Sequence, residues 1–205
     1  MLINPRNKKI LLFCIFLLVA GFFFLLYNKA TAPKQTEQTS VASNIPLDRA
    51  LERITKKPFG IQIFKANSPV QPEKFSGFHT GTDLETFENE QDKDIQVRAI
   101  CEGKILLKKQ ASGYGGVAVQ ECQLNSQSVT VIYGHLKFSS IKAQGTLLKA
   151  GDILGILGKG YSSETDGERK HLHLAVHKGV SVNILGYVQK QEDLENWFDP
   201  LEFLK

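Results

Sequence analysis

Histidine is scarce in this sequence, and its placement indicates a metal site. The five histidines are His79, His135, His171, His173 and His177. His79 is followed four residues later by Asp83, with Gly81 between them, so a tight backbone can bring the imidazole and the carboxylate to one point. His171 and His173 are two apart in the alternating run HLHLAVH, and residues two apart on a strand point to the same face. Imidazole and carboxylate groups are zinc ligands, so zinc chemistry is indicated.

Each motif alone also has a structural interpretation. A His-x-x-x-Asp spacing is common by chance, and an alternating run such as HLHLAVH is typical of the solvent face of an amphipathic strand. His135 follows the apolar run 129–133, where a lone histidine is usually structural. His177 lies four residues beyond His173, about 13 Å along a strand, so we expect it at the surface.

Together these residues match the ligand set of a catalytic zinc site, which has three protein ligands and an open position for water. We predict that His79, Asp83 and His173 bind Zn²⁺, the one cofactor we expect. His135 and His171 remain nearby for proton transfer and for stabilising charge in the transition state. Metal-assisted hydrolysis is chemistry that such a set can perform.

The same motifs resemble those of a known family, the lysostaphin-type (LytM-domain) zinc metallopeptidases, which are peptidoglycan endopeptidases. The family pattern is H-x-x-x-D, then aromatic-x-H-L, then H-x-H, and all three occur here in that order. The resemblance implies that His79, Asp83 and His173 bind zinc, and that His135 and His171 are catalytic. It also implies that the substrate is a peptide bond of peptidoglycan. Which catalytic histidine is the general base stays open.

The resemblance covers roughly residues 59–204, with supporting matches in GYGG at 113–116, KAGDILG at 149–155 and the pair Asp199-Pro200. One departure lies just before H-x-H, where family members usually carry a short Ser/Thr-Gly-Pro turn. Residues 161–170 read YSSETDGERK instead, which is longer and charged. We therefore expect a different cleft rim and do not carry over a substrate preference. No wall-binding module is recognisable in the sequence, so we expect targeting to rest on the membrane.

Three alternative functions differ in their requirements. A catalytically inactive relative that binds and activates other wall hydrolases is the main alternative, but such scaffolds typically lack zinc ligands. A carrier or phosphotransfer module could share the 147–158 segment, yet it does not need His79 and Asp83. A D-alanyl-D-alanine peptidase has its His and Asp ligands further apart than these two.

The elements that must position these residues are mainly strands. Short runs rich in β-branched residues and broken by glycine predict an antiparallel β domain; they are 95–100, 103–107, 116–120, 129–133, 153–157 and 171–177. The resemblance implies a barrel-like sandwich of the lysostaphin type, similar to a duplicated hybrid motif. We also expect a short N-terminal helix within 46–57 and a closing turn or short helix at 194–204. Tyr114 and Tyr133 are expected to pack in the core, and lining of the cleft is the alternative.

The N-terminus predicts a membrane anchor. Residues 10–27 are 18 apolar or small residues without charge, close to the roughly 17–25 that a spanning helix needs. Arg6, Lys8 and Lys9 precede this span, so residues 1–9 are expected in the cytoplasm and the chain beyond Tyr27 outside it. A signal peptide cleaved after 30–32 is the competing interpretation. Residues 28–45 read as a flexible linker and 46–205 as the extracytoplasmic peptidase domain of a bacterial cell-membrane protein.

Charge and cysteine content agree with this arrangement. Four of the 25 Lys and Arg precede residue 30, which leaves 21 against 21 Asp and Glu. A nucleic-acid binder concentrates positive charge on its folded domain, so we expect no nucleic-acid partner. Cys14 lies in the apolar span as a small hydrophobe. Cys101 and Cys122 could form a disulfide outside the cell or remain buried thiols, and the sequence leaves both open.

Overall fold

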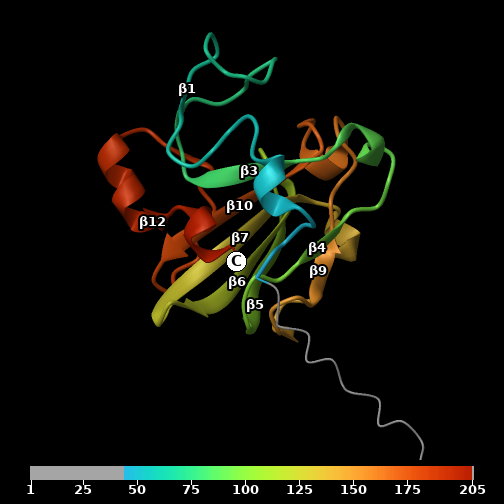
Figure 1. Ribbon diagram of the computed structural model, residues 1–205, viewed down its shortest axis with the longest axis vertical. Coiled ribbons are helices and arrows are strands. Elements are labelled where there is room, and N and C mark those ends of the chain that lie inside the picture. Colours follow the sequence, from blue (N-terminus) through green and yellow to red (C-terminus); the bar gives the residue numbers. More distant parts are fainter. Residues whose placement is uncertain (1–43, 205) are drawn as a thin grey trace, which may run out of the picture. The chain divides into compact units, whose positions relative to one another are not determined.

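The structure is a computed structural model that describes residues 44–204 (Figure 1). The predicted cytoplasmic segment 1–9, the predicted span 10–27 and all but the end of the predicted linker 28–45 lie outside these residues. Within the described part of the chain, no helix is both long and apolar enough to cross a membrane.

Antiparallel strands dominate the described residues, which confirms the predicted mainly β fold. A seven-stranded sheet has the order β12-β10-β7-β6-β5-β8, and its seventh strand, β3, also pairs with β10. The bounds are β3 Gly81–Glu85, β5 Gly103–Ala111, β6 Gly115–Leu124, β7 Gln127–Leu136, β8 Leu147–Leu148, β10 His171–Lys178 and β12 Trp197–Phe198. Figure 1 shows β10 running beside β3 and β7 through the middle of this domain.

The strands of two smaller sheets alternate along the chain with those of the larger one. The first has the order β1-β2-β11, with bounds Gln62–Ile63, Gly77–His79 and Tyr187–Val188. The second pairs β4, Gln96–Arg98, with β9, Ile153–Ile156. Each pairing is antiparallel.

The alternation in β10 separates the core from the site. Leu172, Leu174 and Val176 are fully buried in the main hydrophobic cluster, whereas the intervening residues face the other side of the strand. Tyr133 lies in the same cluster, as predicted. Its hydroxyl donates to Oε1 of Gln120 and accepts from the Ile100 amide, which satisfies the buried polar group.

Helical structure among the described residues consists of short 3-10 turns. The predicted N-terminal helix is reduced to η1, Ala50–Arg53, because Arg49 adopts a left-handed conformation (φ 57°) that stops a helix from forming earlier. The predicted closing element is present as η5, Gln191–Asn196, and η6, Pro200–Phe203, on either side of β12. The other turns are η2 Glu88–Glu90, η3 Phe138–Ser140 and η4 Ser163–Thr165.

The structure pairs Cys101 with Cys122 in a disulfide. Their Cα atoms are 5.9 Å apart, within the range that a disulfide requires. Of the two states left open by the sequence, the structure therefore has the disulfide.

Candidate metal centre

The pairing of β3 with β10 brings the two long-separated motifs together. His173 of β10 lies directly opposite Asp83 of β3, and opposite Gly134 of β7 on its other side. Gly81 allows this close approach, because a Cβ added there would lie 2.9 Å from Cε1 of His173. His79 ends β2, two residues before β3 begins, and so reaches the same place.

Three potential ligand atoms form a nearly equilateral triangle. Nε2 of His79 is 3.0 Å from Nδ1 of His173, and Oδ1 of Asp83 is 3.3 Å and 3.2 Å from these two nitrogens. Zinc ligands about 2.1 Å from a tetrahedral metal are about 3.4 Å apart, so the triangle is close to the size that one face of such a site needs. These three residues form a group whose ligand atoms could hold a metal ion.

Hydrogen bonding fixes the ring of His79 for metal binding. Its Nδ1 lies 3.2 Å from the carbonyl oxygen of Pro58, which can only accept, so this nitrogen carries the proton. Nε2 then points to Nδ1 of His173 and to Oδ1 of Asp83. A carbonyl partner on the outer ring nitrogen is typical of zinc-bound histidine. The donor set therefore fits zinc.

Burial and nearby charges also favour the protonation states that metal ligands need at His173 and Asp83. Burial lowers the pKa of His173 to about 4, so this ring is a neutral ligand at pH 7. Burial alone raises the pKa of the Asp83 carboxyl, but the charges of His171, His79 and Arg169 outweigh it and hold that pKa well below its usual range. Asp83 is therefore ionised, as a metal ligand must be.

His135 and His171 lie next to this triangle, with ring centroids 4.1 Å apart. Nδ1 of His171 lies 2.9 Å from the carbonyl oxygen of Arg169, so Nδ1 carries a proton, and Nε2 lies 3.3 Å from Oδ2 of Asp83. Burial, and then the neighbouring His171, lower the pKa of His135 well below its usual range. His135 belongs to β7 itself, where it takes a left-handed conformation (φ 60°).

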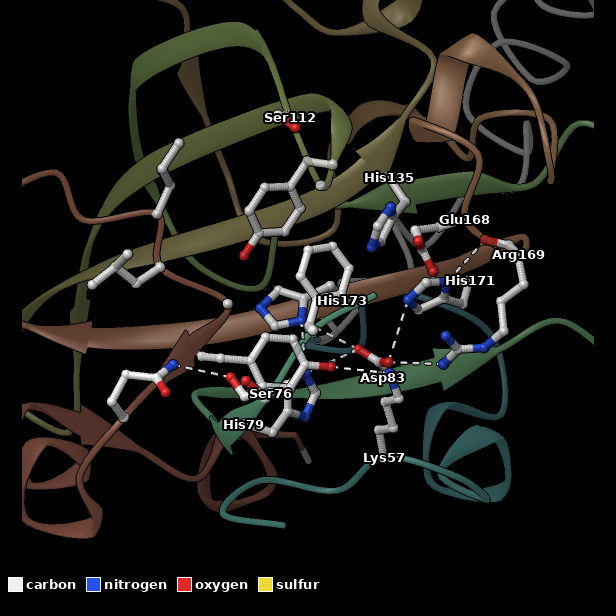
Figure 2. A pocket seen from close by; sticks show the side chains of 18 residues that line it. Lys57, Ser76, His79, Asp83, Ser112, His135, Glu168, Arg169, His171 and His173 are labelled. Atoms are coloured by element: carbon white, nitrogen blue, oxygen red, sulfur yellow. Dashed lines mark hydrogen bonds and ion pairs between the residues drawn. The ribbon is translucent and has the colours of Figure 1, made fainter. Parts of the chain in front are cut away.

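All five predicted site residues line one cleft (Figure 2). Figure 2 shows Asp83 at its centre, with His79 and His173 on one side and His171 and Arg169 on the other. The other lining residues are Lys57, Phe75, Ser76, Ser112, Gly113, Tyr114, Glu168, Ile184, Leu185, Gly186, Tyr187 and Gln189.

Sequence reasoning missed some of the cleft residues. Tyr114 is buried in a hydrophobic cluster, as expected, and it also lines the cleft, where its ring lies against His135 and His173 with centroids 5.5 Å and 5.4 Å away. Its place in the GYGG motif was the available signal. Tyr187 lies beside His79 because β11 pairs with β2, and Arg169 reaches Asp83 from the charged segment before β10. These two contacts depend on strand register, and no local motif indicates them.

The prediction that His177 is a surface residue is wrong. The residue is buried, and its ring packs edge-on against Trp197 with the centroids 4.7 Å apart. β12 pairs with this end of β10 and places Trp197 opposite His177, which covers the face that the alternation left polar. His177 is not among the residues that line the cleft.

Known proteins show both sequence and fold similarity to the chain. The sequence model of peptidase family M23 matches residues 77–184, more than half of the chain. The catalytic domain of the antimicrobial peptidase lysostaphin from Staphylococcus simulans is 21% identical, covers 78% of this chain and 98% of its own, and has a TM-score of 0.51. A structure of LytU is 24% identical over 74% of this chain and 83% of its own, with a TM-score of 0.48. No curated protein matches. The likeness to the lysostaphin domain shows a lysostaphin-like fold.

Proposed function

The chain belongs to peptidase family M23 and is a zinc metallopeptidase; we propose that it is an endopeptidase that hydrolyses peptide bonds in peptidoglycan. We further propose that His79, Asp83 and His173 are the zinc ligands and that His135 and His171 act on the substrate. The observation that carries this proposal is the triangle of ligand atoms with sides of 3.0–3.3 Å, next to two more histidines. A zinc ion held there supplies a Lewis acid that polarises a carbonyl and lowers the pKa of a water towards about 7.

His171 is the better placed of the two histidines to accept a proton. The Arg169 carbonyl accepts from Nδ1–H, and this orients Nε2 toward the ligand triangle. This nitrogen can take the proton of the attacking water and return it to the leaving amine. The arrangement resembles other catalytic bases that are oriented by a hydrogen bond on the far ring nitrogen.

His135 is placed to stabilise the oxygen of the substrate carbonyl. Its ring lies tilted by 37° against that of His171, and its Nδ1 has no hydrogen-bond partner among the described residues. A ring nitrogen held in a buried cleft can donate to an oxyanion without first reorganising. The Tyr114 hydroxyl, also buried and without a partner in residues 44–204, lies on the same wall.

Several features support an extracytoplasmic, membrane-anchored location. Residues 10–27 have the length and composition of a span, with positive residues before it. The Cys101–Cys122 disulfide is typical of oxidising compartments outside the cytoplasm. We therefore propose an anchor at 10–27, a linker at 28–45 and a peptidase domain at 46–205, with peptidoglycan and the membrane as partners. All three ligand positions are filled, so the inactive-scaffold alternative has no support in the site.

Zinc content and wall hydrolysis together test the proposed function. The full chain, purified in detergent, should bind zinc near one ion per chain and release peptides from purified peptidoglycan. Asp83→Ala should lose both properties. Mass analysis of the released fragments identifies the bond that is cut. Zinc binding without release of any wall fragment would refute peptidoglycan as the substrate, and a folded chain that binds no zinc would refute the ligand set.

A further inference from the structure

The side chain of Arg169 connects Asp83 to a second buried carboxylate, Glu85. Nη2 of Arg169 donates to Oδ2 of Asp83 at 2.7 Å and also makes a short contact with Oε1 of Glu85. Nε donates to both Glu85 oxygens, at 3.0 and 2.9 Å. All three residues are buried, so this network is shielded from water.

The network divides the two oxygens of Asp83 between two tasks. Oδ1 faces the ring nitrogens of His79 and His173, whereas Oδ2 accepts the 2.7 Å hydrogen bond from Arg169 and lies 3.3 Å from Nε2 of His171. The terminal torsion of an aspartate is broad, so the side chain alone does not fix which oxygen faces the ligand triangle. A buried guanidinium on Oδ2 supplies this orientation.

Glu85 balances the charge of Arg169. A guanidinium is always protonated, and an unbalanced one near a divalent cation opposes binding of that cation. The two-point contact with Glu85 neutralises this charge and fixes the plane of the guanidinium. Arg169 can then orient Asp83 without adding net positive charge beside the metal.

We propose that Arg169 is a positioning residue of the zinc site: supported by Glu85, it holds Asp83 so that Oδ1 alone is presented to the metal. This inference rests on the role of Asp83 as a zinc ligand in the proposed function. Arg169 itself is not a ligand.

The charged segment before β10 places Arg169 in this position. The Thr165 hydroxyl donates to the Glu168 carbonyl at 2.7 Å, and Nζ of Lys170 donates to the carbonyls of Glu90 and Gln91 at 3.1 and 3.0 Å. These bonds hold the chain on both sides of Arg169. Residues 161–170, which depart from the family pattern, thus support the metal ligand Asp83 through Arg169. This role explains why the segment is long and charged.

The rival explanation is an ion pair that stabilises the fold and has no effect on the metal. The two explanations differ in how much zinc should stabilise the Arg169 variant against unfolding. A residue that only supports the fold lowers the stability of the zinc-free and zinc-bound protein equally. A residue that orients a ligand lowers zinc affinity and therefore reduces the stabilisation that zinc provides.

Arg169→Met in the full chain separates these explanations. The zinc dissociation constant is measured by competition with a chelator, and unfolding temperatures are recorded with and without zinc. Arg98→Met is the control, since the Arg98 guanidinium donates to Oδ1 of Asp48 at 2.8 Å and Arg98 does not line the cleft. Arg169→Lys keeps the charge without the planar fork and serves if Arg169→Met does not fold.

We expect Arg169→Met to weaken zinc binding by about 10- to 100-fold, the range typical of residues that orient metal ligands. The zinc affinity of Arg169→Lys should fall between that of Arg169→Met and that of the wild type, and Arg98→Met should leave zinc affinity unchanged. The proposal is overturned if folded Arg169→Met and Arg169→Lys bind zinc as tightly as the wild type while Asp83→Ala does not. If Asp83→Ala also keeps wild-type affinity, the ligand set of the proposed function fails instead.

Discussion

Replacing His171 by Asn tests the division between binding and catalysis most directly. The asparagine amide can take the place of Nδ1–H and keep the 2.9 Å hydrogen bond to the Arg169 carbonyl. The substitution removes Nε2, the atom that we assign as the proton acceptor. The three atoms of the ligand triangle are left untouched.

The expected effect is large in turnover and small in metal content. General bases typically contribute a factor of 10²–10⁴ to the rate, so kcat should fall by about that factor. This fall corresponds to about 3–5 kcal/mol of barrier, at 1.36 kcal/mol for each factor of ten. Zinc affinity should fall by about 10-fold, the low end of the range for residues that contact a metal ligand, because Nε2 of His171 also lies 3.3 Å from Oδ2 of Asp83. The kinetic assay is therefore run with zinc in excess.

Two assays on one preparation of His171→Asn separate an effect on catalysis from an effect on zinc binding. Release of new amino groups from purified peptidoglycan gives the rate, and chelator competition gives the affinity for zinc. His173→Asn is the comparison, since it removes a ligand nitrogen from the triangle and should reduce both. A His171→Asn protein with full zinc and a rate within tenfold of the wild type would refute the assignment of His171 as the base.

Three further predictions concern zinc, the disulfide and pH. Removing zinc with a chelator should lower the unfolding temperature, and adding zinc back should restore it, because zinc binds only the folded site. Replacing Cys101 and Cys122 by serine should cost about 3 kcal/mol in urea unfolding, as their sequence separation is 21. Burial lowers the pKa of His177, so the unfolded chain takes up a proton at a higher pH than the folded one. Stability therefore falls as pH drops below about 6.5, and His177→Gln should reduce that slope between pH 7 and 5.

The sequence predicted the site better than its surroundings, and the reason is the range of the interactions. The alternation of His171 and His173 with buried leucines is local, and it predicted that both histidines lie on the face of β10 opposite the leucines. The spacing of His79 and Asp83 is local as well. The contact of Arg169 with Asp83 joins residues 86 apart, and nothing near either residue signals it. Burial of His177 likewise depends on its pairing with Trp197.

The hydrogen-bond ladder of the large sheet explains why most of the site is rigid. β10 contributes His171 and His173, while its neighbours β3 and β7 contribute Asp83 and His135. A slip of one residue in β10 would turn both histidines into the core and its leucines into the cleft, so the register is strongly specified. These four side chains are thus placed before any metal binds.

His79 is the exception, and it leads to a final prediction. It lies on β2 of the three-stranded sheet. Its backbone N–H donates to the Ile61 carbonyl at 3.0 Å, and its carbonyl accepts from the Gly60 N–H at 2.9 Å. Among the three proposed ligands it alone belongs to this sheet, so zinc should tie the small sheet to the large one. Chelation should therefore increase amide hydrogen exchange more in β1, β2 and β11 than in β6 and β7. Equal increases in both sheets would contradict this, because the metal would then stabilise the whole fold rather than the link made through His79.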